Sequence, residues 1–260
     1  MFISETYAYC NGLRGVHPAE KGLFFILTLL IALVNKSLLI SLALAALIII
    51  VLVLKARIPL STILGFMLIP EGFVFFSLSV LVLSLTSEAT GGLILGEWAG
   101  YYLIVSFSGI WLAKTVLAKV IGSLTCMIFF IFTTPLVDII ALLHRLKVPG
   151  IWLELMVLTY RFIFVLLETA VAIYRAQEAR CGFKSRASAF RSLRLLIVNL
   201  FGKTLHRSRQ LVLGLTSRGY KGMILVPKEF PPLSAIHLLG IGAFDLVLGI
   251  IVLGTAGGIL

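Results

Sequence analysis

Charged side chains are scarce in this sequence of 260 residues. Only 13% of the residues are Asp, Glu, Lys or Arg, whereas 60% are hydrophobic. A soluble domain averages about a quarter charged and about half apolar. Together with the mean hydropathy of +1.12, this scarcity excludes an ordinary soluble enzyme and a disordered chain. The three cysteines are widely separated and form no CxxC pair, so we predict neither a disulfide framework nor a zinc site.

Catalytic and ligand-binding motifs are also missing. The sequence has no Walker lysine motif, no GxSxG and no HExxH, and its four histidines include no pair at i,i+4. His17 precedes Pro18 and is typical of a helix start. Glu154 and Glu168 would lie about 21 Å apart along a helix, which is too far for an acid/base pair. We therefore predict no catalytic residue, no metal site and no cofactor.

Long apolar runs are the main feature that is present. A membrane-spanning helix needs roughly 20 apolar residues, and we predict five such helices, the first two as a hairpin around Asn35-Lys36-Ser37. The runs cover residues 23–34, 38–54, 65–85, 101–132 and 235–252. A polar turn is expected at 86–92, and the run 101–132 could instead hold two short helices, which would make six spans. Residues 1–21 carry several charges and do not resemble a cleavable signal peptide.

Positive charge is concentrated in one segment. The net charge is +11, and residues 175–221 hold 11 of the 22 Lys and Arg against a single acid, Glu178. In a membrane protein this excess indicates a cytoplasmic location rather than nucleic-acid binding. We therefore predict an N-terminal region with four spans (1–134), a cytoplasmic domain (135–233) and a C-terminal transmembrane helix (234–260). The N-terminus would lie inside and the C-terminus outside.

The basic segment has the apolar periodicity of helices. Residues 152–178 and 193–215 both have apolar residues at helical spacing, and Lys203 and Arg207 share a local face. We predict long amphipathic helices that lie along or beneath the membrane. The alternative is a basic juxtamembrane segment that only binds anionic lipid.

Two short motifs favour a docking function for these helices. Each places an Arg one or two residues before a Gly at a predicted helix end, where Gly can take the left-handed conformation that closes a helix. A guanidinium held at a helix end is suited to a bidentate contact with a carboxylate of another protein. The candidate docking residues are Ala179, Arg180, Gly182, Ser217, Arg218 and Gly219.

These motifs resemble the coupling-helix signature of the transmembrane T component of energy-coupling factor (ECF) importers. The stretches Phe132–Pro135, Leu142–Pro149 and Leu158–Phe162 are similar to other segments of that family, and Tyr7–Lys21 resembles the N-terminus of its cobalt/nickel branch (CbiQ-like). The resemblance covers nearly the whole chain. The chain departs from the family pattern at two positions. Cys181 is an extra residue between Arg and Gly, and the metal branch resembles this chain in having an extra residue there. Ser217 stands where Ala is more usual.

The resemblance implies an all-α polytopic protein of a prokaryotic plasma membrane that acts as the non-catalytic scaffold of an ATP-driven importer. Two cytoplasmic ABC-type ATPase subunits would each take one coupling-helix end, and a separate small membrane subunit (S) would bind the substrate. The chain itself would bind neither ATP nor metal. Cobalt or nickel is the expected substrate class, with a vitamin-type importer as the alternative within the family.

A stand-alone secondary transporter is the rival from a different class. Such a transporter usually has an internal repeat and several buried charges, and neither is evident in the sequence. Asp245 lies inside the last predicted span and is a candidate for ion relay. The nearby Gly242 and Gly249 favour close helix packing at this place instead.

Overall fold

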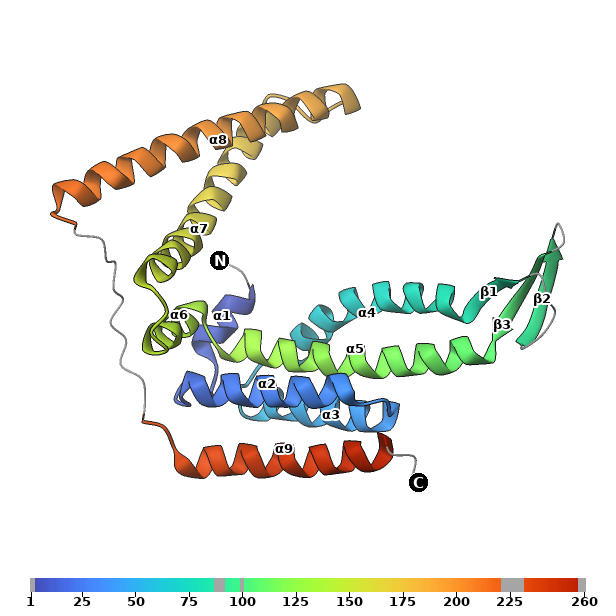
Figure 1. Cartoon of the computed structure of the whole chain (residues 1–260). Coiled ribbons are helices and arrows are strands. Elements are labelled where there is room, and N and C mark those ends of the chain that lie inside the picture. The colour runs from blue at the N-terminus through green and yellow to red at the C-terminus, as the bar shows by residue number, and fades with distance from the viewer. Residues whose placement is uncertain (1–2, 87–91, 99–100, 221–231, 257–260) are drawn as a thin grey trace. The chain divides into compact units, whose positions relative to one another are not determined.

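The computed structural model describes residues 3–86, 92–98, 101–220 and 232–256, and it is mainly α-helical (Figure 1). It divides into two compact units. The first, which we call the bundle unit, contains α1 (Ile3–Cys10), α2 (Pro18–Val34), α3 (Leu38–Leu54), α4 (Leu60–Val82), α5 (Phe107–Thr133) and α9 (Ala235–Ala256). The second, the hairpin unit, contains α6 (Leu136–Arg145), α7 (Gly150–Ala179) and α8 (Arg186–Ser217).

Helix α5 forms the centre of the bundle unit. It packs against α1, α2, α3 and α4, and α9 packs against α2. The core is made by apolar side chains from these helices, among them the fully buried Phe132, Ile48, Leu52 and Ile63. Outward-facing apolar side chains are abundant, for example Phe73, Phe75 and Phe76 on α4. A helix that is apolar all round is typical of a membrane span.

The predicted hairpin is confirmed. Helices α2 and α3 end and begin on either side of Asn35, whose side chain organises the tip. Its Oδ1 accepts a hydrogen bond from the Ser37 N–H at 2.9 Å, and its Nδ2 donates to the Ser41 Oγ at 2.9 Å. The start of α2 also follows the prediction, because His17 is its N-cap and Pro18 opens it. The His17 Nδ1 accepts from the Ala19 N–H at 3.0 Å.

A small sheet was not predicted. Strands β1 (Leu83–Thr86), β2 (Gly92–Trp98) and β3 (Tyr101–Ser106) form an antiparallel sheet in the order β1-β3-β2. The apolar run that begins at Tyr101 therefore starts as a strand, and only its later part, from Phe107, is helical. Aromatic and β-branched residues from 101 to 105 suit a strand. Most of the expected polar turn, residues 87–91, lies outside the described residues.

The alternative of two short helices within residues 101–132 does not hold, because helix α5 is continuous from Phe107 to Thr133. Within the described part of the chain, three helices are long and apolar enough to cross a membrane, namely α4, α5 and α7, and α3 and residues 238–252 of α9 are shorter apolar helices. The protein is thus a helical polytopic membrane protein.

Candidate coupling site

The end of α7 is closed by two crossed backbone hydrogen bonds. Arg180 is the C-cap, the Cys181 N–H donates to the Glu178 carbonyl at 2.9 Å, and the Gly182 N–H donates to the Gln177 carbonyl at 2.9 Å. This pair of bonds defines a Schellman motif. The left-handed residue is Cys181, with φ 56°. The prediction that a glycine holds that position is therefore wrong for the first motif.

The end of α8 has the same geometry. Arg218 is the C-cap, with φ −94° and ψ 12°, against −92° and 16° for Arg180. The Gly219 N–H donates to the Thr216 carbonyl at 3.0 Å, and the Tyr220 N–H donates to the Leu215 carbonyl at 3.1 Å. Here the left-handed residue is Gly219, with φ 71°, as predicted.

The two motifs are equivalent in space without a gap. Arg180 corresponds to Arg218, Cys181 to Gly219, and Gly182 to Tyr220. Cys181 is therefore not an insertion in the structural sense, since it takes the left-handed position that a glycine takes in the other motif. Both arginines are the C-caps of their helices and have the same backbone conformation.

Gly182 has a different role from the predicted one. A Cβ at this position would lie 2.5 Å from the Ser192 Oγ and 2.9 Å from the Gln177 carbonyl oxygen. The buried Ser192 of α8 donates a hydrogen bond to the Gly182 carbonyl at 2.9 Å. Gly182 thus allows the end of α7 to approach the first turns of α8. Apart from its small size, Ser192 has no feature in the sequence that predicts this contact.

The turn between α7 and α8 is fixed on both sides. Helix α8 begins with a capping box, in which the Ser185 Oγ accepts from the Ser188 N–H at 3.2 Å and the Ser188 Oγ accepts from the Ser185 N–H at 3.0 Å. On the α7 side, the rings of Tyr174 and Phe183 are in contact, with centroids 4.7 Å apart. The direction in which Arg180 projects is therefore set by packing.

The second motif lies at the far end of the hairpin. Helix α8 has 32 residues, which corresponds to a length of about 48 Å at 1.5 Å per residue. The hydroxyl of Tyr220, directly after the motif, donates to the carboxylate of Glu154 near the start of α7. The structure therefore does not bring Arg180 and Arg218 together into one site. It holds them at opposite ends of an antiparallel pair of helices (Figure 1).

The predicted docking residues are available to a partner. Ala179, Arg180, Ser217, Arg218 and Gly219 are exposed, and Gly182 is half-buried. Neither guanidinium forms an ion pair with any residue that the structure describes. The Ser217 hydroxyl donates to the Leu213 carbonyl of its own helix at 2.8 Å, so it is satisfied locally. Two exposed and unpaired arginines on rigid helix ends can each accept a carboxylate from another protein.

Metal ligands do not gather in the described ranges, where no three His, Cys, Asp or Glu side chains form a group that could hold an ion. One buried pair of polar side chains joins two helices of the bundle unit. The Thr28 hydroxyl donates to the Asp245 Oδ1 at 3.1 Å, which links α2 to α9. The Asp245 side chain is buried, and its Oδ2 has no hydrogen-bond partner among the described residues.

Comparison with known proteins identifies the family. The model of the CbiQ family, described as a cobalt transport protein, matches residues 11–229. The chain is 30% identical to the uncharacterized protein MJ1089 of Methanocaldococcus jannaschii over 95% of this chain and 91% of that protein. It is 31% identical to the cobalt transport protein CbiQ of Rhodobacter capsulatus over 71% of this chain and 70% of that protein. The same identity relates it to CbiQ of Salmonella typhimurium, over 60% and 69% respectively.

The matched region includes both arginine motifs and most of the bundle unit. Together with the apolar helices, it makes this chain a transport protein and a multi-pass protein of the plasma membrane. The chain belongs to the CbiQ family of cobalt transport proteins.

Proposed function

We propose that the chain is the transmembrane scaffold, or T component, of an ATP-driven importer of the ECF type. The observation that carries this proposal is the pair of equivalent arginine caps at opposite ends of the α7–α8 hairpin. Two identical exposed groups, about 48 Å apart along one rigid helix, suit two copies of one kind of partner better than a single ligand. The partners proposed are two cytoplasmic ABC-type ATPase subunits, each taking one arginine.

The hairpin unit is proposed to lie on one side of the membrane. Helix α7 is apolar enough to span a bilayer, but its two ends are tied to α8 through Gly182–Ser192 and Glu154–Tyr220. Helix α8 therefore runs beside it. That helix carries cations along its length, at Arg186, Arg191, Arg194, Lys203, Arg207 and Arg209, and crossing a bilayer would be very costly for them. This supports an in-plane position for both helices and a cytoplasmic location for residues 135–233.

The proposed mechanism is mechanical transmission. When ATP closes the ATPase dimer, the two docked arginines are displaced together with the ATPase subunits. Because both ends of α7 contact α8, the hairpin moves as one piece instead of bending at its turn. Its motion is then passed to a separate substrate-binding S subunit, which tilts or releases its substrate. In this mechanism the chain itself hydrolyses no ATP.

Cobalt is the first substrate to test, because two of the relatives are named cobalt transport proteins. Nickel and a vitamin are the alternatives within the same type of importer. A stand-alone secondary transporter would use Asp245, the buried acid of α9, for ion relay. That rival predicts uptake by the chain without ATPase subunits.

Charge-conserving substitutions test the docking arginines. In Arg180→Lys, Arg218→Lys and the double variant, lysine keeps the charge but lacks the planar fork that binds a carboxylate at two points. Truncating one partner of a buried ion pair costs roughly 2–5 kcal/mol, which is about 30-fold or more in docking affinity. We expect lysine to recover this loss only in part. Co-purification of the ATPase subunits and uptake of radioactive cobalt are the measurements.

The matched control is Arg191→Lys, an exposed position on the same helix that lies outside both motifs. If the double variant assembles and transports like this control, the arginines act only as surface charge and the docking proposal is wrong.

A further inference from the structure

A groove with unpaired cations lies between α7 and α8, and neither docking arginine lines it. Its central cavity has a volume of about 390 Å³, and an adjoining cavity of about 220 Å³ shares several of its wall residues. We call the two together the hairpin groove. Its lining includes the cations Arg161, Lys203 and Arg207 and the apolar Phe162, Val165 and Leu166. One of its cations, Lys203, also lines a neighbouring cavity of about 420 Å³ that Arg180 borders.

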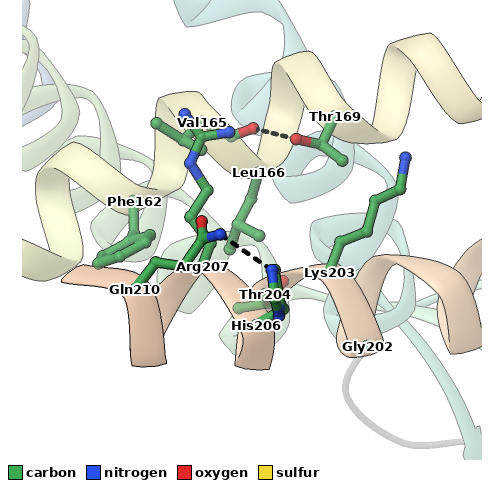
Figure 2. A pocket seen from close by; sticks show the side chains of 10 residues that line it. All are labelled: Phe162, Val165, Leu166, Thr169, Gly202, Lys203, Thr204, His206, Arg207 and Gln210. Atoms are coloured by element: carbon green, nitrogen blue, oxygen red, sulfur yellow. Dashed lines mark hydrogen bonds between the residues drawn. The ribbon is translucent and has the colours of Figure 1, made fainter. Parts of the chain in front are cut away.

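The charge of the groove is of one sign. Arg161 comes from α7, and Lys203 and Arg207 come from α8, whereas no Asp or Glu lines either cavity. None of the three cations forms an ion pair with a residue in the described part of the chain. Figure 2 shows the side chains of Lys203 and Arg207 extending from α8 toward α7. Lys203 and Arg207 line the larger cavity together, and Arg207 lines the smaller one with Arg161. In each cavity two cations repel each other unless an anion lies between them.

Apart from Arg161 and Thr169, the α7 wall is apolar. Phe162, Val165 and Leu166 face Lys203 and Arg207 from α7 (Figure 2). The hydroxyls in the wall do not compete for a ligand, because Thr169 donates to the Val165 carbonyl at 2.7 Å and Thr204 to the Leu200 carbonyl at 2.6 Å. The larger cavity therefore offers the cationic donors of α8 opposite hydrocarbon from α7, which matches an amphiphile with an anionic head.

The outer face of α8, which points away from the groove, is suited to the membrane interface and would bring α8 near anionic lipids without lining the site. Ile197, Phe201 and Leu205 recur at intervals of four residues and are 65%, 65% and 46% exposed. This stripe lies on the side of the helix away from Lys203 and His206, since residues four apart share a face. An apolar stripe on a basic helix is typical of the membrane interface, where anionic lipids are concentrated.

We infer that the hairpin groove binds the phosphate group of an anionic phospholipid, with Lys203 and Arg207 contacting the phosphate and the apolar wall of α7 contacting the glycerol and the first acyl carbons. The inference concerns a site separate from Arg180 and Arg218 and does not depend on the proposed ATPase partners.

The test is a titration of the purified full-length chain in a neutral detergent. The probes are dioctanoyl-phosphatidylglycerol, the zwitterionic dioctanoyl-phosphatidylcholine and inorganic phosphate, with bound molecules counted by native mass spectrometry. The variant is Lys203→Gln combined with Arg207→Gln. The control is Arg191→Gln combined with Arg209→Gln, which removes the same charge from the same helix at exposed positions outside the groove. Circular dichroism and gel filtration verify that both variants are folded.

We expect the unchanged chain to bind phosphatidylglycerol in preference to phosphatidylcholine. A cation near an anionic lipid contributes roughly a factor of five in affinity, so the groove variant should bind about 30-fold more weakly and the control within about twofold of the unchanged chain. Equal losses in both variants would mean diffuse surface charge and would overturn the site. Tight binding of inorganic phosphate that displaces the lipid would assign the groove to a soluble phosphate compound instead.

Discussion

A cysteine holds the left-handed position at the end of α7, where a glycine holds it at the end of α8. A residue with a Cβ pays about 1–2 kcal/mol in this conformation, and part of that cost is recovered because glycine is more flexible in the unfolded chain. The hydrogen bonds of the Schellman motif must therefore stabilise Cys181 in its place. This residue is exposed, so packing does not explain the choice of cysteine.

Replacing this cysteine should stabilise the hairpin unit. We expect Cys181→Gly to raise the free energy of unfolding by about 0.5–1 kcal/mol, because it removes the strain of the left-handed backbone. That corresponds to a melting temperature about 2 °C higher for a chain of this size, measured by thermal unfolding in detergent. Cys181→Ala is the control, since alanine lacks the thiol but keeps the Cβ. An equal gain in both variants would show that the thiol, not the backbone, is responsible.

Gly182 should be intolerant of even one methyl group. In Gly182→Ala the new Cβ would contact the Ser192 Oγ and a backbone carbonyl, and overpacking of this kind costs roughly 1–3 kcal/mol. Gly214→Ala serves as the control, because nothing lies within 4 Å of the added Cβ and alanine is preferred to glycine within a helix by about 1 kcal/mol. The two variants should thus change thermal stability in opposite directions. Adding Ser192→Gly to Gly182→Ala should restore part of the lost thermal stability. If it does not, contact of the new Cβ with Ser192 is not the cause of the destabilisation.

Among the elements, α2 and α9 share a buried side-chain hydrogen bond in addition to apolar packing such as the ring contact of Phe24 with Phe244. The Thr28 hydroxyl donates to the Asp245 Oδ1 at 3.1 Å, and both side chains are buried. The Thr28 hydroxyl also lies 2.6 Å from the Phe24 carbonyl of its own helix. We expect Thr28→Val to destabilise the bundle unit by about 1–3 kcal/mol, because it leaves a second carboxyl oxygen without a partner. Thr28→Ser, which keeps the hydroxyl, is the matched control, and thermal unfolding in detergent is the measurement.

A substitution of Asp245 distinguishes a structural role of this acid from a role in ion relay. An amide at position 245 still accepts the bond from Thr28 but cannot exchange a proton. In the proposed importer Asp245→Asn should therefore keep ATP-dependent uptake within about threefold of the unchanged protein, since no step of the mechanism needs a proton there. Loss of uptake with an intact, assembled complex would instead favour the secondary-transport rival.

Sequence reasoning located elements well where polar residues interrupt the apolar runs. Asn35 marks the tip between α2 and α3 because its side chain bonds both the backbone carbonyl and the backbone N–H of Ser37, and Pro18 marks the start of α2. The strand β3 was missed because residues 101–105 are as apolar as the helix that follows, so no change of composition separates them. Hydropathy alone cannot distinguish a strand from a helix in such a run.

The candidate site was predictable only in part. The two arginines and their helix ends follow from the spacing of Arg and Gly in the sequence. The partners that fix those ends do not, because Ser192 and Glu154 are 10 and 66 residues away from the groups that they contact. Which residue takes the left-handed position at the first motif was also not evident, since Cys181 and Gly182 were both available and glycine is the usual choice.

For the whole molecule, the orientation of α7 decides whether one scaffold can engage two cytoplasmic partners. Arg180 and Arg218 lie at opposite ends of the α7–α8 hairpin. If α7 crossed the bilayer, α8 would cross beside it and the two arginines would lie in different compartments. Only one of them could then reach an ATPase. If α7 lies in the plane of the membrane, both are on the cytoplasmic side, as the concentration of positive charge in residues 175–221 favours.

The native thiol of Cys181 allows the orientation of α7 relative to the membrane to be tested directly. It is exposed and lies next to Arg180, whereas Cys126 is buried and the exposed Cys10 can be removed as Cys10→Ser. A second protein, with Cys181→Ser and Ser217→Cys, carries its reporter beside Arg218. We expect a membrane-impermeant maleimide to label neither thiol in intact cells and both after permeabilisation, because both arginines face the cytoplasm. Labelling of one thiol from outside and the other only from inside would establish that α7 spans the bilayer, and the scaffold could then present one docking arginine rather than two.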